Sequence, residues 1–255
     1  SAKIMKQGVG DLIKMILSAP KVSKQVKRLK DKGYPVNRIL DIIGNDNETN
    51  TIVYTSPEFQ PCSESFSDKY AFVGPSVRTA TESIEKKREK LIYISMGTVN
   101  NDKMPFYRTC ISALADTDYQ VIMSVGNLVS VQEFGNLPEN ISVYSHVDQI
   151  AVLEKADMFV SHCGMNSVSE SLYFEVPLVI LPQTTEQKGV AERVLELGAG
   201  IKLDKENKEN ILNAVNQILK DSAYKKNAGK IAKGFKNCSG AKGAADKIIQ
   251  VCNME

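Results

Sequence analysis

The stretch HCGMNSVSE, residues 162–170, lies between two apolar runs at 157–161 and 177–181. Short apolar runs bounded by polar turns are typical of buried parallel strands. A polar turn between a strand and a helix can hold an anion, because Gly164 lets the backbone approach a ligand and the helix start offers free amides. Glu170, on the first turns of that helix, suits sugar hydroxyls and not phosphate. The stretch therefore predicts a nucleotide site with a ribose contact.

The composition narrows the class of protein. The chain has 255 residues, of which 42% are hydrophobic and 24% charged, as in ordinary globular proteins. Its net charge of +2 indicates no nucleic-acid or acidic-membrane partner, and the basic cluster from Lys21 to Lys32 favours a solvated helix face. Five cysteines without a Cys-x-x-Cys pair, and only two histidines, indicate a cytoplasmic protein with reduced thiols and no metal site. No apolar run suggests a transmembrane segment, and no signal peptide is visible.

From residue 91 onward the sequence alternates between strand and helix patterns. Strands are predicted at 91–95, 120–125, 141–144, 158–161, 178–181 and 200–203, and helices at 104–115, 149–155, 166–174 and 187–197. Apolar stripes predict three further helices around 211–219, 224–235 and 244–249. This alternation predicts an α/β fold: a Rossmann-like parallel sheet with helices on both faces and ligands at the carboxyl ends of its strands.

The parts of the chain are expected to divide as follows. Residues 1–75, with helices at 4–17 and 21–32 and a strand at 51–55, form the tail of a second, N-terminal α/β domain. Residues 76–90, rich in Ser, Thr, Glu and Lys, form a linker. Residues 91–238 form the nucleotide-binding domain, and residues 239–255 a C-terminal helix. Because the sequence starts within a helical pattern and without Met, we expect a fragment.

Polar residues follow several of the predicted strands. The turn SMGT at 95–98 suits a phosphate or sugar contact, although a plain tight turn explains it equally well. His146 can stack on a base whose edge Gln149 fixes, or it is an ordinary surface histidine. His162 closes a buried strand directly before Gly164, where an imidazole nitrogen can reach a diphosphate oxygen. The polar side chains after it are also good helix caps, which is compatible with a phosphate role.

Together these segments resemble the macrolide-type, UDP-sugar-dependent glycosyltransferases, relatives of the plant and animal UDP-glycosyltransferases. The resemblance runs from Tyr54 to about Cys252. Its pieces are SPEFQP at 56–61, FVGP at 72–75, YISMGT at 93–98, LPEN at 137–140, the stretch at 162–170, and PQTTEQ at 182–187. It implies a GT-B glycosyltransferase, in which two Rossmann-like halves face each other across a cleft and residues from 91 onward form the donor-binding half. No cofactor is implied beyond the UDP-sugar substrate.

The resemblance also implies roles for individual residues. The diphosphate would be contacted by His162, Gly164, Asn166 and Ser167, with Gly97 and Thr98 nearby. The ribose hydroxyls would be held by Glu170, and the uracil would lie at His146, Val147 and Gln149. The hexose would lie at Glu186 and Gln187. The closing Gln187 favours UDP-glucose. Two departures from the family are His146, where a Trp usually stacks on uracil, and Asp148, where Pro is usual. The catalytic base of the family is a histidine near the start of the acceptor half, so no catalytic residue is assigned here.

The implied reaction is inverting transfer of a hexose from UDP to a hydroxyl of a small acceptor that is polyketide, phenolic or lipid-like. Two alternatives remain: a UDP-sugar-binding module or subunit without catalysis of its own, and a UDP-sugar 2-epimerase. The fragment alone is expected to be inactive. A Rossmann dehydrogenase is disfavoured, because no Gly-x-Gly-x-x-Gly follows the first strand of the series.

Overall fold

The computed structural model describes residues 20–34, 36–38, 49–98 and 100–253. The chain divides into two units, Ser1–Asn50 and Thr51–Glu255. In the first unit, residues 20–31 are helical, which confirms the helix predicted at 21–32. The helix predicted at 4–17 lies outside the described residues. All the features discussed below belong to the second unit.

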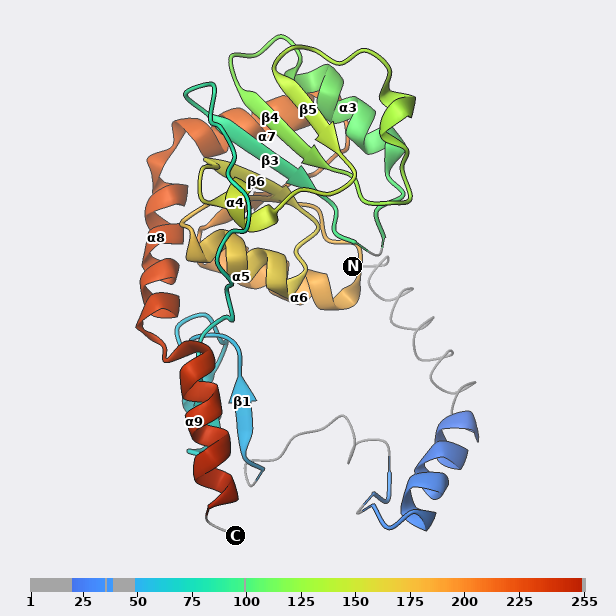
Figure 1. Cartoon of the computed structure of the whole chain (residues 1–255), viewed down its shortest axis with the longest axis vertical. Coiled ribbons are helices and arrows are strands. Elements are labelled where there is room, and N and C mark those ends of the chain that lie inside the picture. The colour runs from blue at the N-terminus through green and yellow to red at the C-terminus, as the bar shows by residue number, and fades with distance from the viewer. Residues whose placement is uncertain (1–19, 35, 39–48, 99, 254–255) are drawn as a thin grey trace. The chain divides into compact units, whose positions relative to one another are not determined.

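The second unit is built on a six-stranded parallel sheet in the order β5-β4-β3-β6-β7-β8 (Figure 1). Its strands are β3 (Leu91–Ser95), β4 (Gln120–Ser124), β5 (Ile141–Tyr144), β6 (Met158–Ser161), β7 (Leu178–Ile180) and β8 (Gly200–Lys202). All six were predicted, three of them one residue too long. The chain runs outward from β3 to β5 and then returns to place β6 beside β3. Loops therefore diverge at the carboxyl ends of β3 and β6, where sheets of this kind bind ligands.

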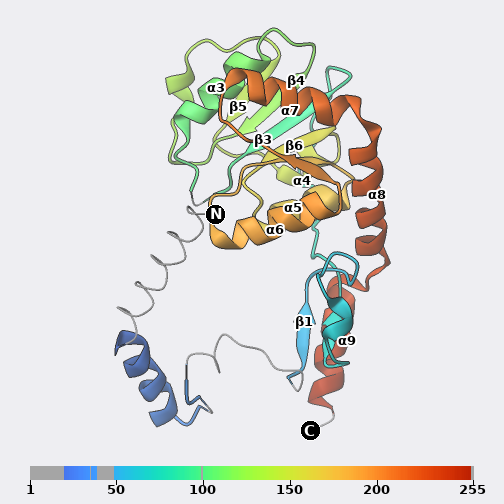
Figure 2. The ribbon, with the colours of Figure 1, turned by 180° about the vertical axis from the view of Figure 1, so that it is seen from behind.

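Helices cover both faces of this sheet (Figures 1 and 2). They are α3 (Met104–Leu114), α4 (Gln149–Leu153), α5 (Met165–Tyr173), α6 (Thr185–Glu196), α7 (Lys208–Lys220) and α8 (Ser222–Asn237). Successive side chains of a strand point to opposite faces. Ile92 and Ile94 of β3 accordingly pack with α3 and α7, whereas Leu91 and Tyr93 pack with α4, α5, α6 and α8. The predicted α/β class, with helices on both faces, is confirmed.

A smaller parallel sheet pairs β1 (Thr51–Val53) with β2 (Tyr70–Phe72), and both views show α9 (Gly240–Cys252) beside β1 (Figures 1 and 2). The amide of Gly240 donates to the carbonyl oxygen of Val73 over 2.7 Å, which ties the start of α9 to the end of β2. The strand β2 was not predicted, because its last residue, Phe72, begins the FVGP motif, whose Gly and Pro indicate a turn. Short 3-10 helices lie at Ser63–Ser65 and Val131–Phe134.

The sequence grouped residues 51–75 with an N-terminal domain, but in the structure they fall in the same unit as the six-stranded sheet. The reason is local packing. The Phe59 ring lies 5.6 Å from that of Phe235 on α8. Arg193 of α6 donates from Nε to the carbonyl oxygen of Phe59 over 2.7 Å and from Nη2 to that of Glu58 over 2.8 Å. The SPEFQP motif is thus an anchor for two helices.

The connecting segment, residues 76–90, contains no helix or strand but is held closely against the sheet domain. The Nζ of Lys86 lies 2.6 Å from Oδ2 of Asp157, which also accepts the amide of Leu91 over 2.9 Å. Nη1 of Arg88 donates to the carbonyl oxygen of Thr117 over 3.1 Å. The segment therefore has the composition of a linker but makes specific hydrogen bonds and an ion pair with the sheet domain.

Asn140 organises the turn between α3 and β4, and its replacement should destabilise the fold. Its buried Nδ2 donates to the carbonyl oxygens of Leu114 (2.9 Å), Thr117 (3.3 Å) and Tyr119 (2.9 Å). Asn140→Ala removes all three of these buried hydrogen bonds, so the free energy of unfolding should fall by about 1–3 kcal/mol. Urea unfolding followed by circular dichroism measures the change. Asn237→Ala, at an exposed site, should shift it by less than about 0.5 kcal/mol; equal stabilities of the two variants would contradict the assigned role.

Candidate functional site

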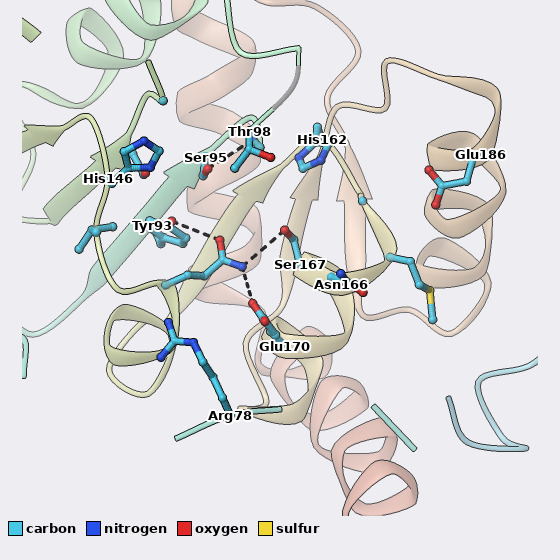
Figure 3. A pocket seen from close by; sticks show the side chains of 17 residues that line it. Arg78, Tyr93, Ser95, Thr98, His146, His162, Asn166, Ser167, Glu170 and Glu186 are labelled. Atoms are coloured by element: carbon cyan, nitrogen blue, oxygen red, sulfur yellow. Dashed lines mark hydrogen bonds between the residues drawn. The ribbon is translucent and has the colours of Figure 1, made fainter. Parts of the chain in front are cut away.

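A pocket of about 570 Å³ opens at the carboxyl ends of β3 and β6 (Figure 3). Eleven of the twelve predicted site residues line it, and Gln187 does not. The residues that the structure brings together are Gly97, Thr98, His146, Val147, Gln149, His162, Gly164, Asn166, Ser167, Glu170 and Glu186. They come from the ends of three strands and from the first turns of three helices. The pocket thus occupies the switch point of the sheet, where the strand order predicts a ligand.

His162 lies at the centre of the pocket, packed against two glycines. Gly97 has a φ of +82°, and a Cβ built on it would lie 2.5 Å from Cε1 of His162. A Cβ on Gly164 would lie 2.7 Å from Nε2 of the same ring. Both positions therefore need glycine so that the imidazole can lie against the backbone. The Nδ1 atom of His162 is buried and has no hydrogen-bond partner.

Burial lowers the pKa of the His162 imidazole below its ordinary value. The ring is therefore neutral near pH 7, with one nitrogen able to donate a hydrogen bond. A neutral imidazole beside a polar cavity is suited to donate to a ligand oxygen and to become charged when an anion arrives.

The start of α5 faces the same cavity. Its N-cap is Gly164, which supplies no side-chain hydrogen bond to the first amides of the helix. Amides that no side chain caps remain available to a ligand, and the helix dipole favours an anion there. Asn166 and Ser167 add polar side chains at the rim (Figure 3).

Cys163 shapes this helix start. Its φ of +65° lies in the left-handed region, which a residue with a side chain adopts at a cost. The side chain is fully buried, and burial raises the pKa of the thiol far above its ordinary value, so the thiol stays neutral. Cys163 therefore contributes packing and turns the chain from β6 into α5.

Gln149 and Glu170 are joined by a hydrogen bond within the pocket. Nε2 of Gln149 donates to Oε2 of Glu170 over 2.5 Å and lies 3.5 Å from Oγ of Ser167. The hydroxyl of Tyr93 donates to Oε1 of Gln149 over 3.3 Å, as the dashed lines in Figure 3 show. Burial raises the pKa of Tyr93 well above its ordinary value, so its hydroxyl keeps its proton. The residues expected at the base and at the ribose thus form one network that reaches from β3 to α5.

Asp148 is the N-cap of α4, and its carboxylate also binds the connecting segment. It accepts the amides of Ile150 over 3.0 Å and Ala151 over 3.4 Å. It also accepts Nη1 and Nη2 of Arg78 over 3.1 and 2.5 Å, and the amide and hydroxyl of Thr81 over 2.7 and 2.8 Å. The guanidinium of Arg78 holds the pKa of Asp148 far below its usual range. The residue that replaces the usual Pro therefore has a structural role of its own.

His146 borders the pocket and is more exposed than His162. Its Nε2 atom lies 2.8 Å from Oδ1 of Asn127, a residue that the sequence did not indicate. This contact orients the imidazole at the position where the family usually has Trp. Six lining residues lie outside the predicted set: Arg78, Tyr93, Ser95, Ser124, Gly126 and Met165. All but Arg78 lie at strand ends or within the motifs named above, so including every residue of those motifs and strand ends would have predicted them.

The side chain of Gln187 closes the start of α6. Its Oε1 accepts the backbone amides of Gln183 over 2.8 Å and Thr184 over 3.2 Å, while the backbone amide of Gln187 donates to Oγ1 of Thr184 over 3.3 Å. These reciprocal bonds form a capping box. In this structure the side-chain oxygen of Gln187 is engaged in the cap and the residue does not line the pocket, so its contact with the hexose stays a prediction. Glu186, beside it, does line the pocket.

Across residues 20–34, 36–38, 49–98 and 100–253, no three His, Cys, Asp or Glu side chains gather as a metal site would require. Among the helices in these ranges, none combines the length and apolar character needed to cross a bilayer.

The Gly97 backbone is expected to control ligand binding through His162. In Gly97→Ala the added Cβ collides with the imidazole, so affinity for UDP, the nucleotide that the sequence resemblance implies, should fall at least about tenfold. Titration calorimetry measures this affinity. The matched control is Gly135→Ala, which has a φ of +65° but nothing within 4 Å of the added Cβ. It carries the backbone strain without the collision, so equal losses of affinity in both variants would refute this explanation.

Comparison with known proteins identifies relatives over most of the chain. The family described as "Erythromycin biosynthesis protein CIII-like, C-terminal domain" matches residues 108–249, more than half of the chain. The chain is 38% identical over 212 residues to the uncharacterized UDP-glucosyltransferase YojK of Bacillus subtilis, covering 80% of this chain and 52% of that protein. It is 40% identical over 207 residues to the NDP-glycosyltransferase YjiC of the same organism, covering 79% and 53%.

Solved structures agree with this result. The glycotransferase of kitacinnamycin superposes with a TM-score of 0.85 at 28% identity, covering 98% of this chain and 66% of that one. The calicheamicin glycosyltransferase CalG4 superposes with a TM-score of 0.78 at 29% identity, covering 89% and 59%. The chain spans about half the length of the curated relatives that it matches. The resemblance seen in the sequence is confirmed: the chain belongs to the UDP-glycosyltransferases of the GT-B fold and contains their C-terminal, erythromycin-biosynthesis-protein-CIII-like domain.

Proposed function

We propose that this chain binds a UDP-sugar and serves as the donor-binding half of an inverting glycosyltransferase that moves a hexose to a hydroxyl of a small molecule. The observation that carries this proposal is the convergence, at one switch point, of a neutral, half-buried histidine and a helix start that no side chain caps. Such a pair suits a diphosphate. The Gln149–Glu170 network beside it suits a ribose.

In this proposal the nucleotide lies along the pocket. Val147 and Gln149 hold the uracil, Glu170 the ribose hydroxyls, and Glu186 the hexose. His162 and the first amides of α5 hold the diphosphate. When the bond between C1 of the hexose and the β-phosphate oxygen breaks, negative charge grows on UDP, and the histidine and the helix dipole stabilise it. The acceptor oxygen bonds to C1 from the opposite side, and its proton passes to a base that we do not place among the described residues.

The donor and acceptor proposals rest on the relatives. The name of YojK makes UDP-glucose the first donor to test, whereas the capping role of Gln187 removes one argument for glucose. The structures for kitacinnamycin and calicheamicin favour a small-molecule acceptor, with polyketide, phenolic and lipid-like compounds as first trials. We also propose residues 91–238 as the donor-binding domain and, from the five free cysteines, a cytoplasmic location.

A UDP-sugar-binding subunit without catalysis is the second candidate. One observation favours it: His162 lies at the proposed diphosphate position and His146 is bonded to Asn127, so neither is placed as the base for an acceptor. A UDP-sugar 2-epimerase is not favoured, because the matching relatives are named as glycosyltransferases.

The first test is binding and transfer in the wild-type chain and in His162→Ala. Calorimetry with UDP and UDP-glucose should show binding, and mass spectrometry after incubation with a phenolic acceptor separates transfer from binding alone. Loss of a hydrogen bond to a charged group costs about 1.5–3 kcal/mol, so His162→Ala should weaken UDP binding about 10- to 100-fold. Unchanged thermal unfolding shows that the variant is folded. Equal affinity of wild type and variant for UDP would remove His162 from the proposal.

A second test uses the proton balance of binding. Burial lowers the pKa of His162 in the free protein, and a bound diphosphate should raise it by favouring the imidazolium. At a pH between these two values, binding takes up protons, so near pH 6 the measured enthalpy should depend on the ionisation enthalpy of the buffer. UDP-glucose is the right ligand, because the terminal phosphate of UDP itself titrates near pH 6, as phosphomonoesters do. His162→Ala should abolish the dependence; persistence in that variant would assign the proton to another group.

A further inference from the structure

The Asp148 carboxylate binds two elements that are far apart in the sequence. Its side chain is only 3% exposed, although the guanidinium-bearing side chain of its partner Arg78 is 50% exposed. One oxygen, Oδ1, caps α4 and accepts Nη2 of Arg78, while Oδ2 accepts Nη1 of Arg78 and both donors of Thr81. A two-pronged contact of this kind fixes geometry as well as charge. The connecting segment is therefore bound to the first turn of α4 across about seventy residues of sequence.

The residue that follows this attachment enters the pocket. Gln149 is the first residue of α4, and its amide group bonds to Glu170 and Tyr93. A shift or rotation of the α4 start would move the Gln149 side chain away from both partners. Arg78 itself borders the pocket, and its charge also interacts with that of Glu170 (Figure 3). The Arg78–Asp148 ion pair, the N-cap of α4 and the hydrogen bonds of Gln149 to Glu170 and Tyr93 thus form one continuous series of contacts.

A second ion pair on the same segment provides the comparison. Lys86 binds Asp157, whose carboxylate also accepts a backbone amide, that of Leu91. The chemistry matches that of the first pair, but Asp157 lies at the amino ends of β3 and β6, at the opposite edge of the sheet from the pocket. None of these three residues lines the pocket. If attachment of the segment mattered only for stability, the two pairs would be equivalent.

We propose that Arg78 and Asp148 are positioning residues for the donor: their ion pair holds the start of α4 so that Gln149 orients Glu170 toward the ribose hydroxyls. This inference rests on the proposed function for its ligand. Asp148, at a position where the family usually has Pro, would then hold the Gln149 end of the pocket in place. Arg78 acts on the nucleotide through Asp148 and not by its own contact.

The experiment measures the dissociation constants of UDP and of 2′-deoxy-UDP for four proteins: wild type, Arg78→Gln, Asp148→Asn and the double variant. Asn caps a helix as well as Asp does, so Asp148→Asn removes the ion pair and keeps the cap. We expect each single variant to bind UDP about tenfold more weakly. The double variant should be no weaker than Asp148→Asn, because residues that act through one contact are not additive. The wild-type preference for UDP over 2′-deoxy-UDP should fall toward one in all three variants.

Lys86→Gln and Asp157→Asn are the matched controls, and they should lower stability while leaving both dissociation constants within about twofold. Three results would overturn the inference: independent, multiplying losses in the double variant, an undiminished preference for UDP in Asp148→Asn, or equal losses of affinity in the control pair. Because Arg78 is half exposed, Arg78→Gln remains a folded test even where Asp148→Asn is unstable. Absence of UDP binding by the wild-type chain would instead refute the proposed function, so the two failures are distinct.

Discussion

The parallel pairing of β3 with β6 is the contact on which the site depends. It aligns Ser95 with Ser161, so the two chains leave the sheet side by side. Gly97 follows one strand and His162 the other, and the ring comes to lie against the glycine backbone. The register of the β3–β6 pair thus decides whether the imidazole of His162, the turn at 95–98 and the start of α5 come together. A slip of one residue would turn every side chain of β6 to the other face.

Most of the fold could be predicted because its signals are local. The strands of the sheet are continuous apolar runs, such as Leu91–Ser95, which is buried along its whole length. The ends of these strands carry the polar turns, so the rule that ligands bind at the carboxyl edge pointed to these turns, and the family resemblance named the eleven residues that line the pocket. The residues of the stretch 162–170 alone predicted a nucleotide site, and the motif match added the kind of nucleotide, a UDP-sugar.

The features that the sequence did not reveal include contacts between residues far apart in the chain and a side chain that could take either of two roles. Arg78 lies in a segment with the composition of a linker, and its partner Asp148 is seventy positions away, so no local pattern reveals the pair. Gln187 has the residue type expected at a hexose and the position expected of a capping box, and the sequence cannot show which role its side chain takes. β2 runs directly into the Gly and Pro of the FVGP motif, so the local signal was that of a turn.

The capping box of α6 constrains substitution at Gln187. A replacement there removes part of the cap and weakens the start of the helix, so selection for a new side chain at this position is opposed by selection for a stable helix. Glu186 has no such obligation: it is exposed and lines the pocket. In the proposed function, in which Glu186 holds the hexose, a change of sugar preference therefore has a freer route through Glu186 than through Gln187.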